Sequence, residues 1–297
     1  MRVIESLEDL TLERHRWQAM HQSLGFVPTM GFLHAGHLAL ALRARAETER
    51  VVASIFINPA QFGPAEDLSR YPRNLPGDLA QLEGAGVDVV FVPHTEAIYP
   101  AGFATYVLPG GTVAERLEAA SRPTHFRGVA TVVAKLFNLV QPDVAYFGQK
   151  DAQQLAVLRQ MVRDLNLPVR LVGVSIVREL DGLAMSSRNA YLGAEDRAAA
   201  TVLHRALEAG RSRFEGGPAD DPAAVGQVIA AMQRVIAAEP RATLDYADVC
   251  LPDTLVPLET LRAPALLAVA ARVGPARLID NFLLRPDGTW DTGAPVA

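Results

Sequence analysis

The chain has 297 residues, of which 49% are hydrophobic and 21% charged, a balance typical of folded globular proteins and not of disordered or collagen-like chains. Its formal charge of −5 provides no broad positive field, which argues against DNA or RNA as the main partner but allows a small anion held by local groups. The single cysteine, Cys250, lies between two apolar residues and is expected to be buried and structural. Acidic residues stand near the N-terminus where a signal peptide would be apolar, and no apolar run reaches about 18 residues, so we expect a cytoplasmic protein.

Short β-branched runs alternate with helical patterns over the first 177 residues. The runs predict strands at 25–28, 51–57, 87–92, 144–147 and 171–177, and apolar spacing predicts helices at 129–140 and 151–165. Because the strands are nearly continuous apolar runs, helices are expected on both faces of the sheet. This part of the sequence predicts an α/β fold with a doubly wound parallel sheet.

The composition changes after residue 177. A polar loop at 181–189 precedes an alanine-rich helical region at 194–210, a break rich in Gly, Pro and Asp at 216–222, a helix at 223–238 and extended runs at 243–249 and 265–273. We therefore predict two domains, 1–177 and a smaller α+β domain at 178–297.

The first segment with chemical potential, P-T-M-G-F-L-H-A-G-H, joins the first predicted strand to a helix. Gly31 and Gly36 allow a ligand close to the backbone, and the N–H groups at the start of a helix favour phosphate. His34 and His37 are three residues apart, share a helix face and are suited to donate to phosphate oxygens. The alternatives are a zinc pair or two unrelated surface histidines, but no third Cys or His ligand completes a metal site.

Two further polar segments follow predicted strands. Asn58 and Gln61 come after the second strand, where parallel sheets bind ligands, although Asn-Pro alone is also a turn signal. After the fourth strand, Lys150 is suited to face a phosphate and Gln154 lies one turn into a helix; Asp151 with Gln154 equally fits a capping box.

A fourth segment, M-S-S-R at 185–188, lies in the polar loop at the expected domain junction. Two hydroxyl groups and an arginine are suited to stabilise a polyphosphate, yet loops of this kind are often only solvated linkers. The sequence contains neither a P-loop nor a G-x-G-x-x-G fingerprint.

Together these segments resemble the pantoate–β-alanine ligase family. His34-Ala35-Gly36-His37 is similar to the H-x-G-H signature of the nucleotidyltransferase superfamily, and the segment at 185–188 is similar to its mobile K-M-S-K-S loop. The family is indicated by the further motifs P-T-M-G at 28–31, N-P-A-Q-F-G at 58–63, Y-P-R at 71–73, R-P-T-H-F-R-G-V at 122–129, F-G-Q-K-D at 147–151, D-G-L-A-M-S-S-R-N at 181–189 and L-I-D-N at 278–281. The resemblance thus spans nearly the whole chain.

The resemblance implies a Rossmann-like domain followed by a smaller lid domain, a homodimer, and ATP-dependent condensation of (R)-pantoate with β-alanine through a pantoyl adenylate, on the route to coenzyme A. Magnesium is expected with the nucleotide. It implies catalytic roles for His34, His37, Lys150, Ser186, Ser187 and Arg188, with His37 as the proton donor. The implied ATP site comprises Met30, Gly31, Phe32, Leu33, His34, Ala35, Gly36, His37, Gly148, Gln149, Lys150, Asp151, Val177, Met185, Ser186, Ser187 and Arg188. Gln61, Gln154 and Asn58 are implied to bind pantoate, and Gln61 also β-alanine.

The sequence departs from the family pattern at a few positions. Gly77 precedes Asp78 where many members have two acids, so no metal ligand is assigned. Ala60 and Thr124 replace the more usual threonine and glycine, and little loss of activity is expected from either. The rival hypotheses are a nucleotidyltransferase that leaves the nucleotide on its product and an ATP-binding protein without catalysis; a tRNA-charging enzyme is disfavoured by the acidic charge.

Overall fold

The computed structural model describes residues 1–64, 66–218, 221 and 223–296, and it divides into two compact units. The first unit comprises Met1–Gly148 and Val157–Val174, and the second comprises Gln149–Ala156 and Ser175–Ala297. The division follows Val174, whereas the boundary predicted from the sequence follows residue 177. The short segment Gln149–Ala156, which carries Lys150 and Gln154, belongs to the second unit.

The first unit contains a six-stranded sheet in the order β1-β4-β3-β2-β5-β6, and every pairing in it is parallel. Its strands are β1 (Arg2–Ile4), β2 (Leu24–Thr29), β3 (Arg50–Ile55), β4 (Val89–Phe91), β5 (Val144–Gly148) and β6 (Arg170–Val174). The strand order runs outward in both directions from β2 and β5, so the carboxyl ends of these two strands mark the topological switch point. Such switch points are where open α/β sheets bind ligands. The predicted doubly wound parallel sheet is confirmed.

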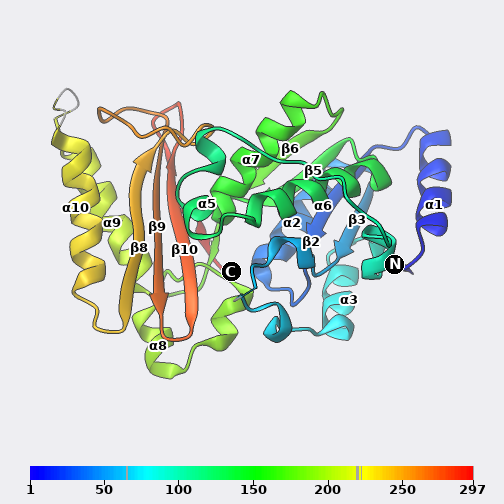
Figure 1. Ribbon diagram of the computed structural model, residues 1–297, viewed down its shortest axis with the longest axis horizontal. Helices are drawn as coiled ribbons and strands as arrows, with labels where there is room; N and C mark the ends of the chain where they lie inside the picture. The colour runs from blue at the N-terminus through cyan, green and yellow to red at the C-terminus, as the bar shows by residue number, and fades with distance from the viewer. Residues whose placement is uncertain (65, 219–220, 222, 297) are drawn as a thin grey trace. The chain divides into compact units, whose positions relative to one another are not determined.

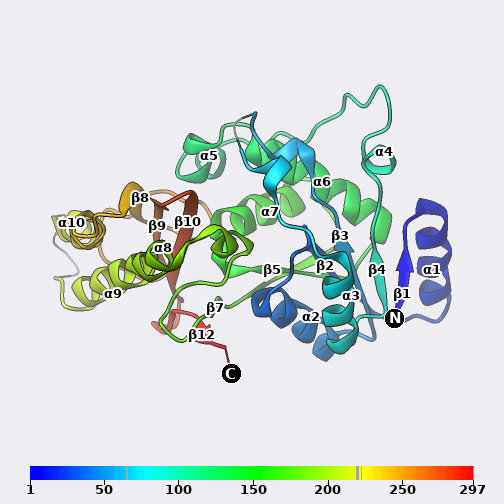
Figure 2. The same cartoon turned by 90° about the horizontal axis from the view of Figure 1, so that it is seen from below.

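Helices cover both faces of this sheet (Figure 2). Alternate residues of β2 point to opposite faces: Val27 packs with Leu40 and Ala44 of α2, whereas Phe26 packs edge-on against Phe137 of α6, with ring centroids 6.4 Å apart. The helices up to the end of β6 are α1 (Leu7–Ala19), α2 (Ala35–Glu47), α3 (Leu75–Gly84), α4 (Thr95–Ile98), α5 (Glu118–Ser121), α6 (His125–Val140) and α7 (Ala152–Asp164), with short 3₁₀ helices η1 (Pro59–Gln61), η2 (Leu68–Arg70), η3 (Thr112–Ala114) and η4 (Gln149–Asp151).

The second unit contains an antiparallel sheet in the order β11-β10-β9-β8, against which α9 and α10 pack (Figure 1). A separate two-stranded sheet pairs β7 with β12. The remaining elements are β7 (Val177–Arg178), η5 (Ser187–Tyr191), α8 (Ala194–Ala199), α9 (Val202–Glu215), α10 (Ala223–Ala237), β8 (Ala242–Cys250), β9 (Ala265–Val273), β10 (Ala276–Leu284), β11 (Trp290–Asp291) and β12 (Ala294–Pro295). Cys250 is buried at the end of β8, as its apolar neighbours indicate.

Several element predictions were wrong in detail. The expected strand at 171–177 is two strands, β6 and β7, which belong to different units, and the expected helix at 194–210 is interrupted between α8 and α9 without any Gly or Pro to mark the break. The N-terminal β1 and α1 and the strand β10 were not predicted. The expected break at 216–222 includes positions 219, 220 and 222, which lie outside the described residues. Within the described part of the chain, no helix combines the length and apolar character needed to cross a membrane.

Candidate active site

The predicted site residues fall into two groups. The first unit holds the loop after β2 and the start of α2, the segment after β3, and Gly148 at the end of β5. The second unit holds Gln149, Lys150, Asp151 and Gln154, Val177 on β7, and the segment from Met185 to Arg188.

The loop after β2 turns sharply and is held by a buried carboxylate. Gly31 has a φ of +83°, a conformation that favours glycine, and Phe32 follows with a φ of +51°. The backbone N–H groups of Phe32 and Leu33 donate to the two carboxylate oxygens of Asp78, at 2.8 and 2.7 Å. Asp78 comes from α3 and is 2% exposed. One side chain from a neighbouring helix therefore fixes the backbone that leads into α2.

The two histidines lie at the N-terminus of α2, where the helix dipole is positive. His34 Nδ1 accepts the backbone N–H of Gly36 at 3.1 Å, and His37 Nδ1 accepts the backbone N–H of His34 at 3.3 Å. A ring nitrogen that accepts carries no proton, so this hydrogen-bond pattern assigns the proton of each neutral ring to Nε2. The ring centroids are 4.1 Å apart. Both imidazoles therefore act as Nε2–H donors beside a helix N-terminus, which is a suitable arrangement for binding phosphate.

The segment after β3 forms a buried polar cluster. Asn58 Nδ2 donates to Gln61 Oε1 at 3.0 Å and to the backbone oxygen of Gly128 at 3.1 Å. Its Oδ1 accepts the backbone N–H of Ala60 at 3.2 Å and the hydroxyl of Tyr99 at 2.8 Å. Burial raises the pKa of Tyr99 above its ordinary value of 10, which keeps the hydroxyl protonated as the donor. The full hydrogen-bonding capacity of Asn58 is thus used within the protein.

Gln61 receives its orientation from this cluster. Its Oε1 accepts from Asn58, and its Nε2 donates to the sulfur of Met30 at 3.0 Å. Helix α6 approaches closely at this point: a Cβ on Gly128 would lie 2.2 Å from the backbone oxygen of Ala60, so glycine is required there. Met30 of the β2–α2 loop and Gln61 of the segment after β3 are therefore in direct contact.

A buried histidine supports the backbone of Gln61. His125 Nδ1 donates to the Gln61 backbone oxygen at 2.9 Å, and His125 Nε2 accepts from Arg122 at 3.2 Å. Burial, together with the positive charge of Arg122, lowers the pKa of His125 to about 4, so the ring is neutral near pH 7. Arg122 also pairs with Glu66 at 2.5 Å; although burial raises the pKa of Glu66, Arg122 outweighs it and holds that pKa below its ordinary value.

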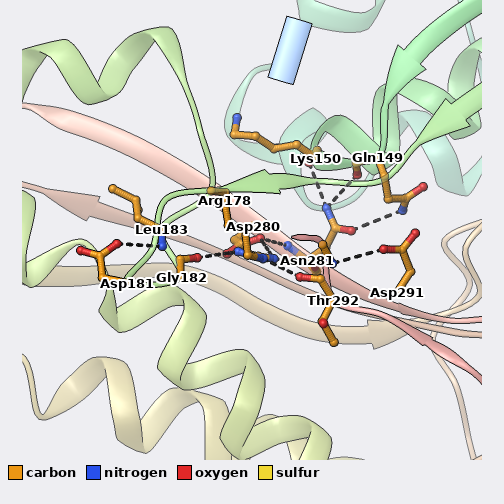
Figure 3. Close-up of polar contacts among 12 residues, drawn as sticks. Gln149, Lys150, Arg178, Asp181, Gly182, Leu183, Asp280, Asn281, Asp291 and Thr292 are labelled. Carbon is orange, nitrogen blue, oxygen red and sulfur yellow. Dashed lines mark hydrogen bonds and ion pairs between the residues drawn. The ribbon is translucent and has the colours of Figure 1, made fainter. Parts of the chain in front are cut away.

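The second unit presents Lys150 on the 3₁₀ turn η4, immediately before α7. Gln149 is buried, Lys150 is half-buried, Asp151 is exposed, and Gln154 is half-buried in the first turn of α7. Figure 3 shows the Lys150 side chain extending away from strand β10, while its backbone is held by Asn281 of that strand.

The serine–arginine segment also lies in the second unit. Ser186 is the N-cap of η5, where its Oγ accepts the backbone N–H of Arg188 at 3.3 Å. Ser187 is buried and Arg188 is half-buried. The backbone N–H of Met185 donates to Val177 on β7 at 3.0 Å, so two predicted ATP-site residues are neighbours. The segment is therefore an ordered turn and not a solvated linker.

The carboxylates of the described residues do not form a metal cage. Among the described residues, no group of three or more His, Cys, Asp or Glu side chains is placed to hold a metal ion. Both oxygens of Asp78, the acid that follows Gly77, accept backbone N–H groups. Asp78 is therefore fully used by the backbone, and the described residues provide no ready-made cage for a metal ion.

The family model described as pantoate-beta-alanine ligase matches residues 2–283. Pantothenate synthetase from Roseiflexus castenholzii is 54% identical over 284 residues, covering 96% of this chain and 99% of that protein. The crystal structure of pantothenate synthetase from Thermus thermophilus is 50% identical with a TM-score of 0.90, covering 96% of this chain and 100% of that one. Pantoate-beta-alanine ligase from Francisella tularensis, solved with beta-gamma ATP and beta-alanine, is 32% identical with a TM-score of 0.77, covering 95% and 97% of the two chains.

Proposed function

The chain belongs to the pantoate-beta-alanine ligase family, and on that premise we propose that it condenses (R)-pantoate with β-alanine at the expense of ATP. The products are pantothenate, AMP and pyrophosphate. The carboxylate oxygen of pantoate attacks the α-phosphorus of ATP and pyrophosphate leaves; the amine of β-alanine then attacks the acyl carbon and AMP leaves. The observation that carries this proposal is the pair of Nε2–H groups at the N-terminus of α2, on the loop whose Met30 contacts the buried amide of Gln61.

ATP is the substrate for which the start of α2 is suited. The backbone N–H groups and the positive end of the helix dipole attract phosphate, and His34 and His37 add two directed donors. We assign His37 as the proton donor to the departing pyrophosphate: its Nε2 is the donor nitrogen, and transfer of a proton requires the imidazolium form of the ring, because the neutral ring donates only a hydrogen bond. Gly31 to Leu33 supply the turn that brings this backbone to the nucleotide. The complex of the Francisella relative with beta-gamma ATP and beta-alanine supports both ligands.

Pantoate is assigned to Gln61 and Gln154, and β-alanine to the same Gln61. The contact of Gln61 with Met30 supports this assignment, because it links the pantoate segment to the start of the ATP loop. Asn58, whose amide is fully engaged with protein groups, acts as the positioning residue of Gln61.

Lys150, Ser186, Ser187 and Arg188 are proposed to stabilise the charge that develops during adenylation. A lysine ammonium and an arginine guanidinium are strong donors to phosphoryl oxygens. The remaining predicted ATP contacts, from Gly148 to Asp151, Val177 and Met185, complete the nucleotide site.

We propose that Mg²⁺ binds together with ATP, as part of the substrate. Mg²⁺ is usually held by substrate phosphates and few carboxylates, and the described residues offer it no cage of their own. The ion then spreads the charge of the phosphates, while the protein supplies N–H donors and cations. We further propose a homodimer, by resemblance, and a cytoplasmic location, to which the buried single Cys250 is suited.

Mass spectrometry of the products tests the proposal. With ATP, Mg²⁺ and pantoate alone, we expect enzyme-bound pantoyl adenylate and pyrophosphate; adding β-alanine yields pantothenate and AMP in equal amounts. A product that retains the nucleotide would favour a nucleotidyltransferase. Binding of ATP without turnover would favour a protein without catalysis. Light scattering of the same sample tests the dimer.

A further inference from the structure

A buried asparagine of the second unit holds the backbone that carries Lys150. Asn281 lies on β10 and is 3% exposed. Its Nδ2 donates to the backbone oxygens of Gln149 at 3.0 Å and Lys150 at 2.9 Å, and its Oδ1 accepts from the Gln149 side chain at 3.3 Å (Figure 3). Both donors of this amide therefore go to the turn that presents Lys150.

The neighbouring residue on β10 anchors the chain that leads to the serine–arginine segment. Asp280 and Arg178 are both buried and form a two-fold ion pair, with N–O distances of 2.7 and 2.8 Å. Arg178 also donates to the backbone oxygen of Gly182 at 2.9 Å. Adjacent positions of one strand thus hold the turn that carries Lys150 and the loop that leads to the serine–arginine segment.

The turn at Lys150 depends on these bonds. It is a 3₁₀ turn of three residues, and a turn this short has few internal hydrogen bonds for its carbonyl groups. Without Asn281, two carbonyl oxygens beside a buried strand would each lose the donor that this side chain supplies, and the backbone would be free to shift. Such a shift moves the Cα of Lys150, and a misplacement of about 1 Å in a catalytic group can cost roughly 10²-fold in rate.

We propose that Asn281 is the positioning residue of Lys150: it contacts no reacting atom, and it fixes the backbone from which the ammonium group reaches the phosphoryl group. The inference rests on the proposed function for the role of Lys150. It goes beyond that function in assigning a role to the asparagine of the L-I-D-N motif.

A double-mutant cycle tests the proposal. N281A is expected to lower the single-turnover rate of adenylation about 10- to 100-fold. In a K150A background, N281A should lower the adenylation rate less than about three-fold. The reason is that Asn281 acts through the Lys150 side chain, which this background already lacks. The KM for β-alanine should stay unchanged. Equal losses in both backgrounds would overturn the assignment.

Two further variants separate positioning from packing. N281D keeps the volume of the side chain but loses both N–H donors, so its adenylation rate should match that of N281A. A wild-type rate in N281D would overturn the proposal. If N281A does not fold, N281D takes its place in the cycle. V228A, which opens the core of the same unit at a fully buried position of α10, is the control for lost stability. It should lower the melting temperature with adenylation within about two-fold of wild type.

Hydrogen exchange tests, without any reaction, whether Asn281 holds the backbone around Lys150. In the full chain without ligand, the backbone amides of 150–153 should exchange faster in N281A than in V228A. Unchanged exchange in N281A would overturn the inference. If the wild type forms no pantothenate while N281A still loosens this segment, the proposed function fails and the anchoring role stands.

Discussion

Asp78→Asn tests how the loop after β2, to which we assign nucleotide binding, is held. Both carboxylate oxygens of Asp78 accept a backbone N–H, from Phe32 and Leu33, and the side chain is buried. An asparagine keeps one acceptor and turns an NH₂ group toward the second N–H. A hydrogen bond to a charged group contributes about 1.5–3 kcal/mol, so we expect a loss of roughly 2–4 kcal/mol.

The loss should be visible in ATP binding. If the loop holds its shape only part of the time, the apparent affinity falls by that fraction, about ten-fold for each 1.4 kcal/mol. We predict that D78N raises the KM for ATP roughly 30- to 700-fold, with a smaller loss of kcat at saturating ATP. Steady-state kinetics over a range of ATP concentrations at fixed pantoate and β-alanine give both values.

The matched control is Asp88→Asn. Asp88 accepts the backbone N–H of Val51 at 2.8 Å and pairs with Arg45 and Arg50, at the amino ends of β3 and β4. D88N should lower the melting temperature and leave the KM for ATP within about two-fold. Equal KM values in D78N and wild type would refute the reasoning. Rescue of D78N by excess Mg²⁺ would instead make Asp78 a metal ligand.

Four more predictions follow from the site. His37→Ala should keep the melting temperature and lower adenylation by about 10²- to 10⁴-fold in single-turnover assays, whereas near-normal turnover would remove this histidine from the mechanism. The pKa of His125 falls from 6.5 to about 4 on folding. The stability that depends on the neutral ring is therefore complete above pH 6.5 and is lost as the pH falls toward 4, by about 3 kcal/mol in total. Denaturant titrations should show this loss in wild type and not in His125→Gln. Gly128→Ala should cost about 1–3 kcal/mol, because its Cβ meets the Ala60 oxygen, and should raise the KM for pantoate more than that for ATP; equal changes in both would count against the assignment of Gln61. Asp280→Ala leaves the charge of Arg178 buried without its carboxylate and should lower the free energy of unfolding by about 3–5 kcal/mol. An unchanged melting curve would contradict this prediction.

The parallel sheet was predictable because each of its central strands is an apolar run followed by a polar turn. The short edge strand β1 lacks such a run, and β10 mixes Asp280 and Asn281 into an apolar stretch, so neither was predicted. The split between β6 and β7 is a tertiary effect: the run at 171–177 is apolar throughout apart from Ser175, but its end pairs with β12, far along the chain.

The candidate site was predictable where one segment carries its own chemistry, as around His34 and Lys150. It was not predictable where a residue acts through a distant partner. Tyr99 bonds to Asn58 from 41 positions away, and Asn281 bonds to Lys150 from 131 positions away. No local pattern marks such contacts. The L-I-D-N resemblance singled out Asn281 without indicating what it holds.

The most direct test of the proposed mechanism is transfer of an isotope label. Pantoate carrying ¹⁸O at both carboxylate oxygens is incubated with ATP, Mg²⁺ and β-alanine, and the products are analysed by mass spectrometry. If the carboxylate attacks the α-phosphorus, one labelled oxygen appears in AMP and the other stays in the amide carbonyl of pantothenate. Unlabelled AMP, or label in inorganic phosphate with release of ADP, would contradict the adenylate route.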